Sequence, residues 1–238
     1  MVHLFLLSAL MATAYGSKMD IYNNCPFTIW PGIQGNPLVV QGGFKLGAGT
    51  GRVVDVPNGW KAARIWARTG CNDNFDCETG FCGNKEQCEG RGGRPPVSLA
   101  EFTLKGAGNQ DFYDVSLVDG YNIPGTYNPG GGQFECKRAG GCNTDVNSVC
   151  PPELALKAGD RTVGCKSACL AFNTDEYCCR GAHGKPESCK PDTWPKNYAK
   201  IFKDACPTAY SYAYDDHSST FTCRGKNGGS PDYYIQFC

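Results

Sequence analysis

Sixteen cysteines in a chain of 238 residues constrain its fold more than any other feature of the sequence. The number is even, and in an oxidising compartment such a set pairs into disulfides. Zinc binding is the competing interpretation of the cysteines between 142 and 179, but beyond residue 16 the chain has only two histidines, His183 and His217, and no paired CxxC units. We therefore predict a disulfide framework, with no metal site and no cofactor. Each bridge would stabilise the fold by roughly 2–4 kcal/mol, so resistance to heat, acid and proteolysis is expected.

The first sixteen residues, MVHLFLLSALMATAYG, have the length and apolar character of a secretory signal peptide. Ala14 and Gly16 supply small residues at the usual cleavage positions, so the mature protein is predicted to start near Ser17. The apolar run is too short to span a bilayer. We expect a secreted, extracellular protein without stable membrane insertion.

The charge of the chain is balanced, because 23 Lys and Arg residues offset 23 Asp and Glu residues. A nucleic-acid-binding protein needs a basic face, and strong attraction to anionic lipid needs positive charge, so neither partner is predicted. Glycine is abundant, with 31 residues, and helix-like periodicity is scarce. These features indicate a mainly β protein.

Composition divides the chain into several parts. Residues 71–96 hold four cysteines and almost no aliphatic residues, so this stretch must be stapled by disulfides. Residues 142–206 hold eight cysteines and two patches with helical spacing, Val163–Phe172 and Tyr198–Cys206. Elsewhere the chain alternates in the manner of β-strands, including Ala209–Tyr214. The predicted organisation is a signal peptide at 1–16, a β-sandwich core of residues 17–70, 97–141 and 207–238, a small disulfide-stapled subdomain at 71–96, and a helical and loop-rich, disulfide-rich subdomain at 142–206.

Two alternating runs, Leu99–Leu104 and Phe112–Val118, flank a glycine-rich turn signal at 106–109 and predict a β-hairpin. If the hairpin is centred on that turn, Glu101 lies directly across from Asp114, with Cβ atoms roughly 5 Å apart. Opposed like charges are unfavourable in a sheet. Either a cation compensates this pair or the pair serves a function.

Several segments carry the motifs of a known family. They are YNNCPFTIWPG, ARIWARTGC, CETGFCG, PPVSLAEFTL, DFYDVSLVDGYNIP, GCKSACLAFNTDEYCC and CPTAYSYAYDDHSSTFTC. On these segments the sequence resembles the thaumatin-like family (pathogenesis-related, osmotin and thaumatin type) over essentially the whole mature chain. The resemblance implies a flattened β-sandwich with two disulfide-rich subdomains. It also implies the bridges Cys25–Cys238, Cys71–Cys77, Cys82–Cys88, Cys136–Cys223, Cys142–Cys206, Cys150–Cys165, Cys169–Cys178 and Cys179–Cys189.

Two departures from the family pattern lie between residues 71 and 96. Phe81 stands where the family usually has Asp between Gly and Cys, and the five-residue loop between Cys71 and Cys77 is shorter than is typical of plant members. Both departures lie outside the predicted β core, so they do not change the expected fold. They bear only on contacts that this loop would make with a partner. They resemble the invertebrate branch of the family more than the plant branch.

Members of the family commonly carry an electronegative cleft lined by one Arg, one Glu and three Asp. The matching positions here are Arg64 in ARIWAR, Glu101 in LAEF, Asp114 in FYDVS, Asp119 in LVDG and Asp215 as the first acid of YAYDD. The resemblance implies that these five residues line the cleft and bind the ligand. We expect the opposite side of the cleft to be formed by residues 142–206.

Hydrolysis of a glycosidic bond needs two carboxyl groups about 5–9.5 Å apart, one of which holds a proton. Asp114 and Asp119 would be about 16 Å apart on one extended strand, which excludes them as the pair unless the chain turns at Asp119-Gly120. Crowding of acids raises at least one pKa, and Arg64 would keep a neighbouring acid ionised. The catalytic prediction is therefore Glu101 as proton donor, with Asp119 or Asp114 as the second carboxylate.

These features predict a monomeric, secreted defence protein of antifungal type. It would bind, and at most weakly hydrolyse, a β-1,3-glucan-type polysaccharide in the acidic cleft. Whether it is an enzyme is left open, and binding is the favoured interpretation. The alternative is a non-catalytic module for a protein or receptor, in which the arginine and the four acids form a structural salt network.

Overall fold

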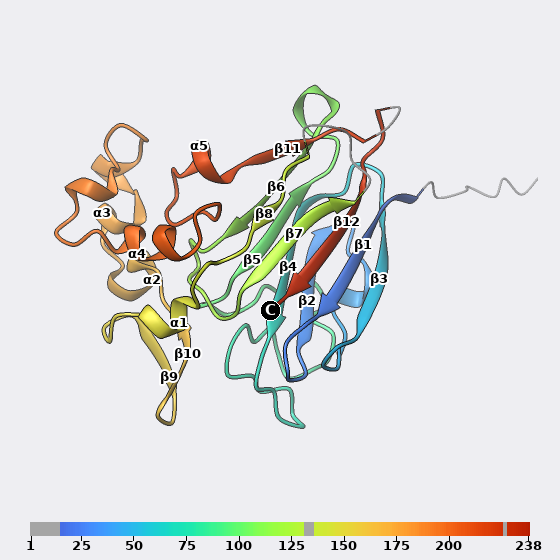
Figure 1. Cartoon of the computed structure of the whole chain (residues 1–238), viewed down its shortest axis with the longest axis horizontal. Helices are drawn as coiled ribbons and strands as arrows, with labels where there is room; N and C mark the ends of the chain where they lie inside the picture. The colour runs from blue at the N-terminus through green and yellow to red at the C-terminus, as the bar shows by residue number, and fades with distance from the viewer. Residues whose placement is uncertain (1–14, 131–135, 226–227) are drawn as a thin grey trace, which may run out of the picture.

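Two five-stranded sheets pack face to face in the computed structural model, which describes residues 15–130, 136–225 and 228–238 (Figure 1). The first sheet has the order β3 (Gly51–Pro57), β1 (Tyr15–Asn23), β12 (Asp232–Phe237), β7 (Gly125–Gly130) and β8 (Ala139–Gly140). The second has the order β11 (Phe221–Cys223), β6 (Asp111–Ser116), β5 (Leu99–Thr103), β4 (Lys61–Arg68) and β2 (Trp30–Asn36). The predicted mainly β sandwich is confirmed. The signal-peptide prediction falls largely on residues outside the described ranges; of its span, Tyr15 and Gly16 lie in β1.

Alternation along the strands builds the core between the sheets. Ile21 of β1 and Val54 of β3 face inward from the first sheet, and Ile65, Phe102 and Tyr113 face inward from the second. The residues between them in β4, β5 and β6 point away from the core. The outer face of the second sheet is therefore where polar side chains from adjacent strands meet.

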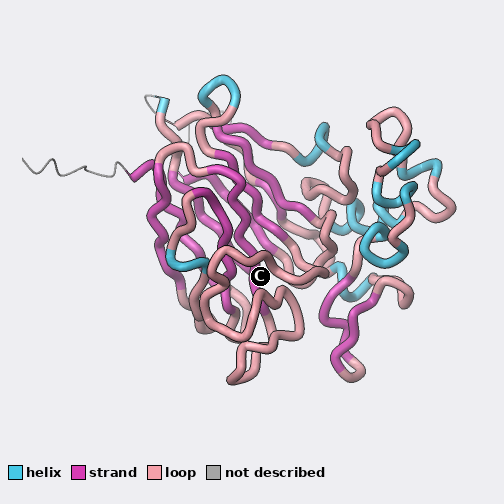
Figure 2. The backbone as a smooth tube through the Cα atoms, turned by 180° about the vertical axis from the view of Figure 1, so that it is seen from behind, coloured by secondary structure: helices cyan, strands magenta, loops and turns pink. Residues whose placement is uncertain are grey.

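The helices and the hairpin of β9 (Ala155–Ala158) and β10 (Arg161–Cys165) lie to one side of the sandwich, as Figures 1 and 2 both show. The helices are α1 (Val146–Val149), α2 (Ala168–Phe172), α3 (Asp175–Cys178), α4 (Tyr198–Ala205) and α5 (Asp216–Ser219), with 3₁₀ turns at Val40–Gly42, Ala107–Asn109, Gly181–His183 and Pro191–Thr193. We call residues 142–206, which hold α1–α4, β9 and β10, the lateral lobe.

The helix predicted at Tyr198–Cys206 is confirmed as α4, but the one predicted from Val163 is wrong in its first half. Residues 163–165 belong to β10, and α2 begins only after Ser167, whose hydroxyl accepts a hydrogen bond from Leu170 N. Such a cap fixes the start of a helix regardless of the apolar spacing before it. Ala209–Tyr214 is also not a strand, because in it only Tyr210 makes a bridge, to Ser116.

All sixteen cysteines lie in disulfides, in the pairing that the family resemblance implies. The bridges are Cys25–Cys238, Cys71–Cys77, Cys82–Cys88, Cys136–Cys223, Cys142–Cys206, Cys150–Cys165, Cys169–Cys178 and Cys179–Cys189. The first of these joins the end of the chain to the segment just after β1, where β1 and β12 run parallel.

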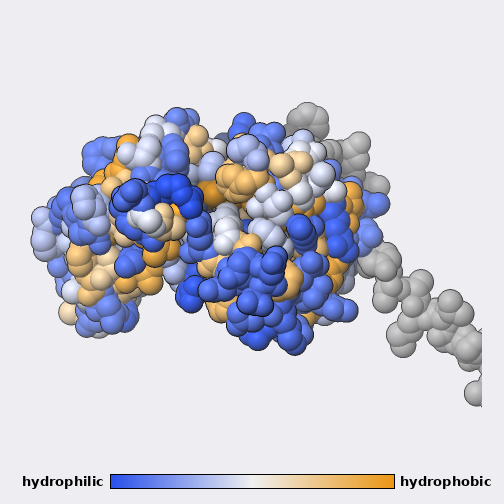
Figure 3. Space-filling model, turned by 90° about the horizontal axis from the view of Figure 1, so that it is seen from below, coloured by the Kyte–Doolittle hydropathy of each residue, from blue (hydrophilic) through white to orange (hydrophobic). Residues whose placement is uncertain are grey.

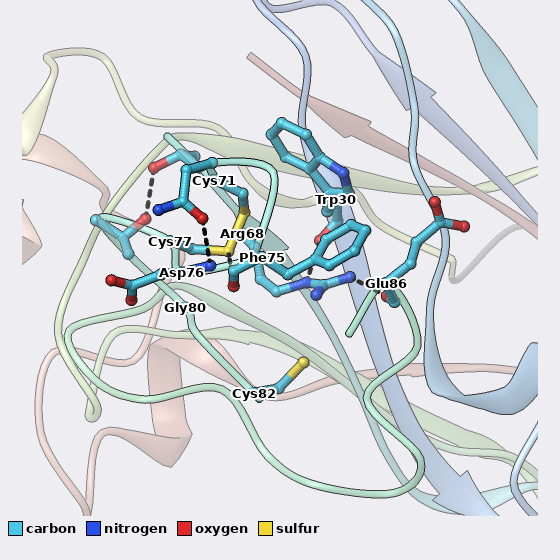
Figure 4. The surroundings of a disulfide bond; sticks show 12 residues. Trp30, Arg68, Cys71, Phe75, Asp76, Cys77, Gly80, Cys82 and Glu86 are labelled. Carbon is cyan, nitrogen blue, oxygen red and sulfur yellow. Dashed lines mark hydrogen bonds between the residues drawn. A yellow bond between two sulfur atoms is a disulfide. The ribbon is translucent and has the colours of Figure 1, made fainter. Parts of the chain in front are cut away.

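The segment 71–96, here called the excursion, covers one end of the outer face of β4. Trp66 packs there against the Cys82–Cys88 bridge, and its indole N–H donates to Gly80 O at 2.9 Å. Arg68 is fully buried and donates to the carbonyls of Trp30, Lys85 and Glu86. Figure 4 shows its guanidinium group between Trp30 and Glu86. Burial lowers the pKa of Arg68 to about 10. The excursion thus leaves only the Arg64 end of that face open.

Candidate functional site

Three neighbouring strands place Arg64, Glu101 and Asp114 in one row on the outer face of the second sheet. In the register of the sheet, Arg64 of β4 lies opposite Glu101 of β5, and Glu101 lies opposite Asp114 of β6. The predicted hairpin register is therefore confirmed. Arg64 Nε donates to Glu101 Oε1 at 2.8 Å, so a cation does compensate one of the two opposed acids.

The second acid, Asp114, is not compensated in the same way. Its Oδ1 atom is buried and has no hydrogen-bond partner among the described residues. Burial, reinforced by the charges of Glu101 and Asp216 and partly opposed by Arg64, raises the pKa of Asp114 to about 8. The row therefore combines a carboxylate held by a guanidinium with a carboxyl group that keeps its proton at neutral pH.

Two connected hollows meet at this row. One, with a volume of about 580 Å³, runs over β2 and β4 to the excursion, with Gln34, Leu38 and Gly90 among its lining residues. The other, with a volume of about 370 Å³, runs past Ser116 and Asp119. Both are lined by Arg64, Glu101 and Asp114. We call the combined feature, which is open to solvent, the acidic groove. The second sheet, whose outer face carries the row, is turned to the viewer in Figure 2.

Asp119 lies in the groove because the chain turns before it. Strand β6 ends at Ser116, and Gly120, at a φ of 89°, donates to Leu117 O at 2.9 Å to close a turn. The extended-strand separation expected between Asp114 and Asp119 therefore does not apply. Both acids line the same hollow.

The structure separates the two neighbouring acids of YAYDD. Asp215 is turned away from the groove: Lys203 Nζ lies 2.7 Å from its Oδ2, and the hydroxyls of Ser211 and Ser218 donate to it at 2.9 Å. Asp216 is the acid that lines the groove, and its Oδ1 accepts a hydrogen bond from the Tyr210 hydroxyl at 2.9 Å. Four of the five predicted cleft residues therefore meet, and Asp216 takes the fifth place.

The wall opposite the row is formed by Tyr210, Ala213 and Asp216, not by residues 142–206 as expected. The lateral lobe contributes from behind this wall. Lys203 of α4 donates to the carbonyl of Ala209 at 2.8 Å, and the Trp194 ring meets the Tyr212 ring edge-on at 5.9 Å. The sequence could not show that residues 210–216 form the wall and that the lateral lobe only supports them, because this depends on the side of that segment against which the lobe packs.

Residues 23–238 match the model of the Thaumatin family. This chain belongs to the thaumatin family. It is 52% identical over 237 residues to "Pathogenesis-related protein 5" of Arabidopsis thaliana, covering 97% of this chain and 92% of that protein. It is 45% identical over 234 residues to "Glucan endo-1,3-beta-glucosidase" of Prunus avium, covering 94% and 91%. These relatives come from plants, so they lend no support to the invertebrate grouping suggested by Phe81 and the short loop.

The thaumatin fold also extends to proteins with little sequence in common with this chain. A laminaripentaose-producing β-1,3-glucanase, solved in complex with laminaritetraose, superposes with a TM-score of 0.63 at 13% identity and covers 93% of this chain and 98% of its own. That likeness concerns the fold. Across the described ranges, no helix has the length and apolar character needed to cross a membrane, and no three His, Cys, Asp or Glu side chains are grouped to hold a metal ion.

Proposed function

We propose that this thaumatin-family protein is a secreted defence protein of antifungal type that binds β-1,3-glucan-type polysaccharide in the acidic groove. The observation that carries the proposal is the row of Arg64, Glu101 and Asp114 at the meeting point of two open hollows. A polymer needs a groove that continues on both sides of the contact point, and sugar hydroxyls need adjacent donors and acceptors. The name of the Prunus avium relative supports the ligand class.

The same row suggests which acid would act if the bound glucan is hydrolysed. Burial, reinforced by the charge of Glu101, raises the pKa of Asp114 to about 8, so Asp114 keeps its proton at neutral pH, whereas Glu101 accepts a hydrogen bond from Arg64 Nε. Directly opposed residues have Cβ atoms about 5 Å apart, which suits the closely spaced carboxyl groups of a retaining mechanism. The proposal therefore reverses the sequence-based roles, with Asp114 as proton donor and Glu101, held by Arg64, as the second carboxylate.

Binding to an insoluble linear β-1,3-glucan and sugar release from it test the two parts of the proposal. We expect Glu101→Gln to weaken binding by about tenfold or more, because it removes a charged acceptor. Any sugar release should fall by about 10²-fold or more in Asp114→Asn, since a general acid contributes at least that much. The matched control is Asp204→Asn, an exposed acid of α4 whose loss should change neither quantity.

The outcomes separate the alternatives. Binding that depends on Glu101, without sugar release by the wild type, identifies a glucan-binding protein that is not a hydrolase. Binding that is absent, or equal in all variants, contradicts the proposal and favours the protein- or receptor-binding alternative.

A further inference from the structure

A second groove lies between the excursion and the β9–β10 hairpin, and it shares no lining residue with the acidic groove. Its volume is about 670 Å³, which is within the usual range for ligand sites. Its lining residues include Phe27, Trp30, Glu78, Ile123, Arg161 and Val163. Figure 3 views the molecule from this side and shows a paler, partly apolar hollow between two hydrophilic projections.

One part of this second groove is apolar. Phe27 is 43% exposed, one of the few large apolar side chains left open to solvent among the described residues. Trp30, from the start of β2, lies on the same floor together with Ile123 and Val163. An aromatic ring that is left accessible inside a concave surface offers a flat face on which an apolar ligand face can pack.

The rim of the second groove is polar, and contacts within the protein fix the positions of its two charged side chains, Arg161 and Glu78. Arg161 Nη2 donates to Glu78 Oε1 at 2.8 Å, and both side chains remain partly open to solvent. Gly70 has a φ of 61°, and a Cβ atom at this position would lie 2.6 Å from Glu78 Cδ. Backbone hydrogen bonds between Thr69 and Thr79 tie the two ends of this loop together. The carboxyl of Glu78 therefore occupies space that only a glycine leaves free.

The charged side chains of the second groove already have hydrogen-bond partners within the protein. Glu78 and Arg161 compensate each other, and the carboxyl of Asp145 accepts hydrogen bonds from the Tyr121 hydroxyl and from Asn147 N. Both acids and the arginine among the described lining side chains are thus hydrogen-bonded within the protein, and a neutral ligand rich in hydroxyl groups can bind beside them without adding a charge. The groove therefore presents the aromatic ring of Phe27, the Glu78 carboxylate as an acceptor, and the Arg161 guanidinium, which has further N–H groups free to donate.

We infer that the second groove binds a neutral saccharide. The C–H face of a sugar ring packs on Phe27, while its hydroxyls donate to Glu78 and accept from Arg161. A further hollow of about 410 Å³ continues beyond Glu78 toward Arg94 and Lys157, so the bound saccharide extends over more than one ring. The inference does not depend on the acidic groove, because the two sites have no residue in common.

Titration of the full, disulfide-bonded chain with laminaritetraose, cellotetraose and maltotetraose, followed by amide chemical shifts, tests this inference. At least one tetrasaccharide should shift the amides of Phe27, Glu78 and Arg161. Phe27→Ala should weaken that binding by about tenfold or more. The matched control is Phe172→Ala, which removes a ring of similar exposure that contacts Tyr177 and Tyr198 in the lateral lobe.

Arg161→Gln is the second test variant, because an exposed side chain can be replaced without a cost in folding. It should weaken binding at the second groove by several-fold, and Asp204→Asn, which replaces an exposed acid outside both grooves, should leave that binding unchanged. If no tetrasaccharide shifts these amides, or if Phe27→Ala and Arg161→Gln bind as the wild type does, the inference is wrong. If Glu101→Gln has no effect on glucan binding while Phe27→Ala does, only the proposed function of the acidic groove fails.

Discussion

Asp114 links the chemistry of the acidic groove to the stability of the fold. Burial raises its pKa from 3.8 to about 8, so between these values the folded protein holds a proton that the unfolded chain releases. The free energy of unfolding therefore falls as the pH rises through this window. Asp114→Asn removes the ionisable group, so its free energy of unfolding should not show this fall. Relative to the wild type, the variant should gain as much as a few kcal/mol of stability between pH 5 and pH 9, since one pKa unit corresponds to about 1.4 kcal/mol. Chemical denaturation with the disulfides intact measures the difference.

The control for this prediction is Asp160→Asn, because Asp160 is exposed in the turn between β9 and β10. Its stability should follow that of the wild type at both pH values. If Asp114→Asn shows the same pH dependence as the wild type, Asp114 does not hold its proton at neutral pH, and its role as proton donor loses its basis.

At the scale of elements, α4 holds the second wall of the acidic groove through one side chain. Lys203 Nζ donates to two carbonyls and two serine hydroxyls of residues 207–219 and lies 2.7 Å from Asp215. Lys203→Met would leave Asp215 largely buried without its cation, which should destabilise the protein by about 1–3 kcal/mol. It should also weaken glucan binding, because Asp216 would no longer be held beside Asp114. Denaturation and binding measurements on the same sample test both effects.

Lys200→Met is the matched control, because it removes a lysine from the same helix. Lys200 pairs with Asp204 at the surface, and such pairs contribute about 0–0.5 kcal/mol. Equal losses in the two variants would show that helix α4, and not the Lys203 contacts, sets the stability.

Comparison of two elements shows how far the sequence could predict the site. The register of the β5–β6 hairpin follows from local alternation and a glycine turn, so the pairing of Glu101 with Asp114 was predictable. The choice between Asp215 and Asp216 was not, because adjacent acids in a turn carry the same local signal. That choice is made by Lys203, a residue of another element whose packing depends on the whole lateral lobe.

At the scale of the whole molecule, the disulfides differ in how much chain they close. Cys25–Cys238 closes a loop with a sequence separation of 213 residues, whereas Cys169–Cys178 closes one of 9 within the lateral lobe. Even with the shortcut through Cys136–Cys223, more than a hundred residues separate the ends of the first loop. By loop entropy the first bridge should stabilise the fold by about 5 kcal/mol and the second by about 3 kcal/mol.

The test replaces both cysteines of one bridge by serine and measures thermal and denaturant unfolding under oxidising conditions, so that the other seven bridges stay closed. The Cys25/Cys238 variant should lose more stability for two reasons. Its unfolded chain gains more freedom, and in the folded state the bridge holds the end of β12 beside β1, the parallel pair at the centre of the first sheet. Equal losses in the two variants would mean that local packing, and not chain closure, decides what each disulfide contributes in this fold.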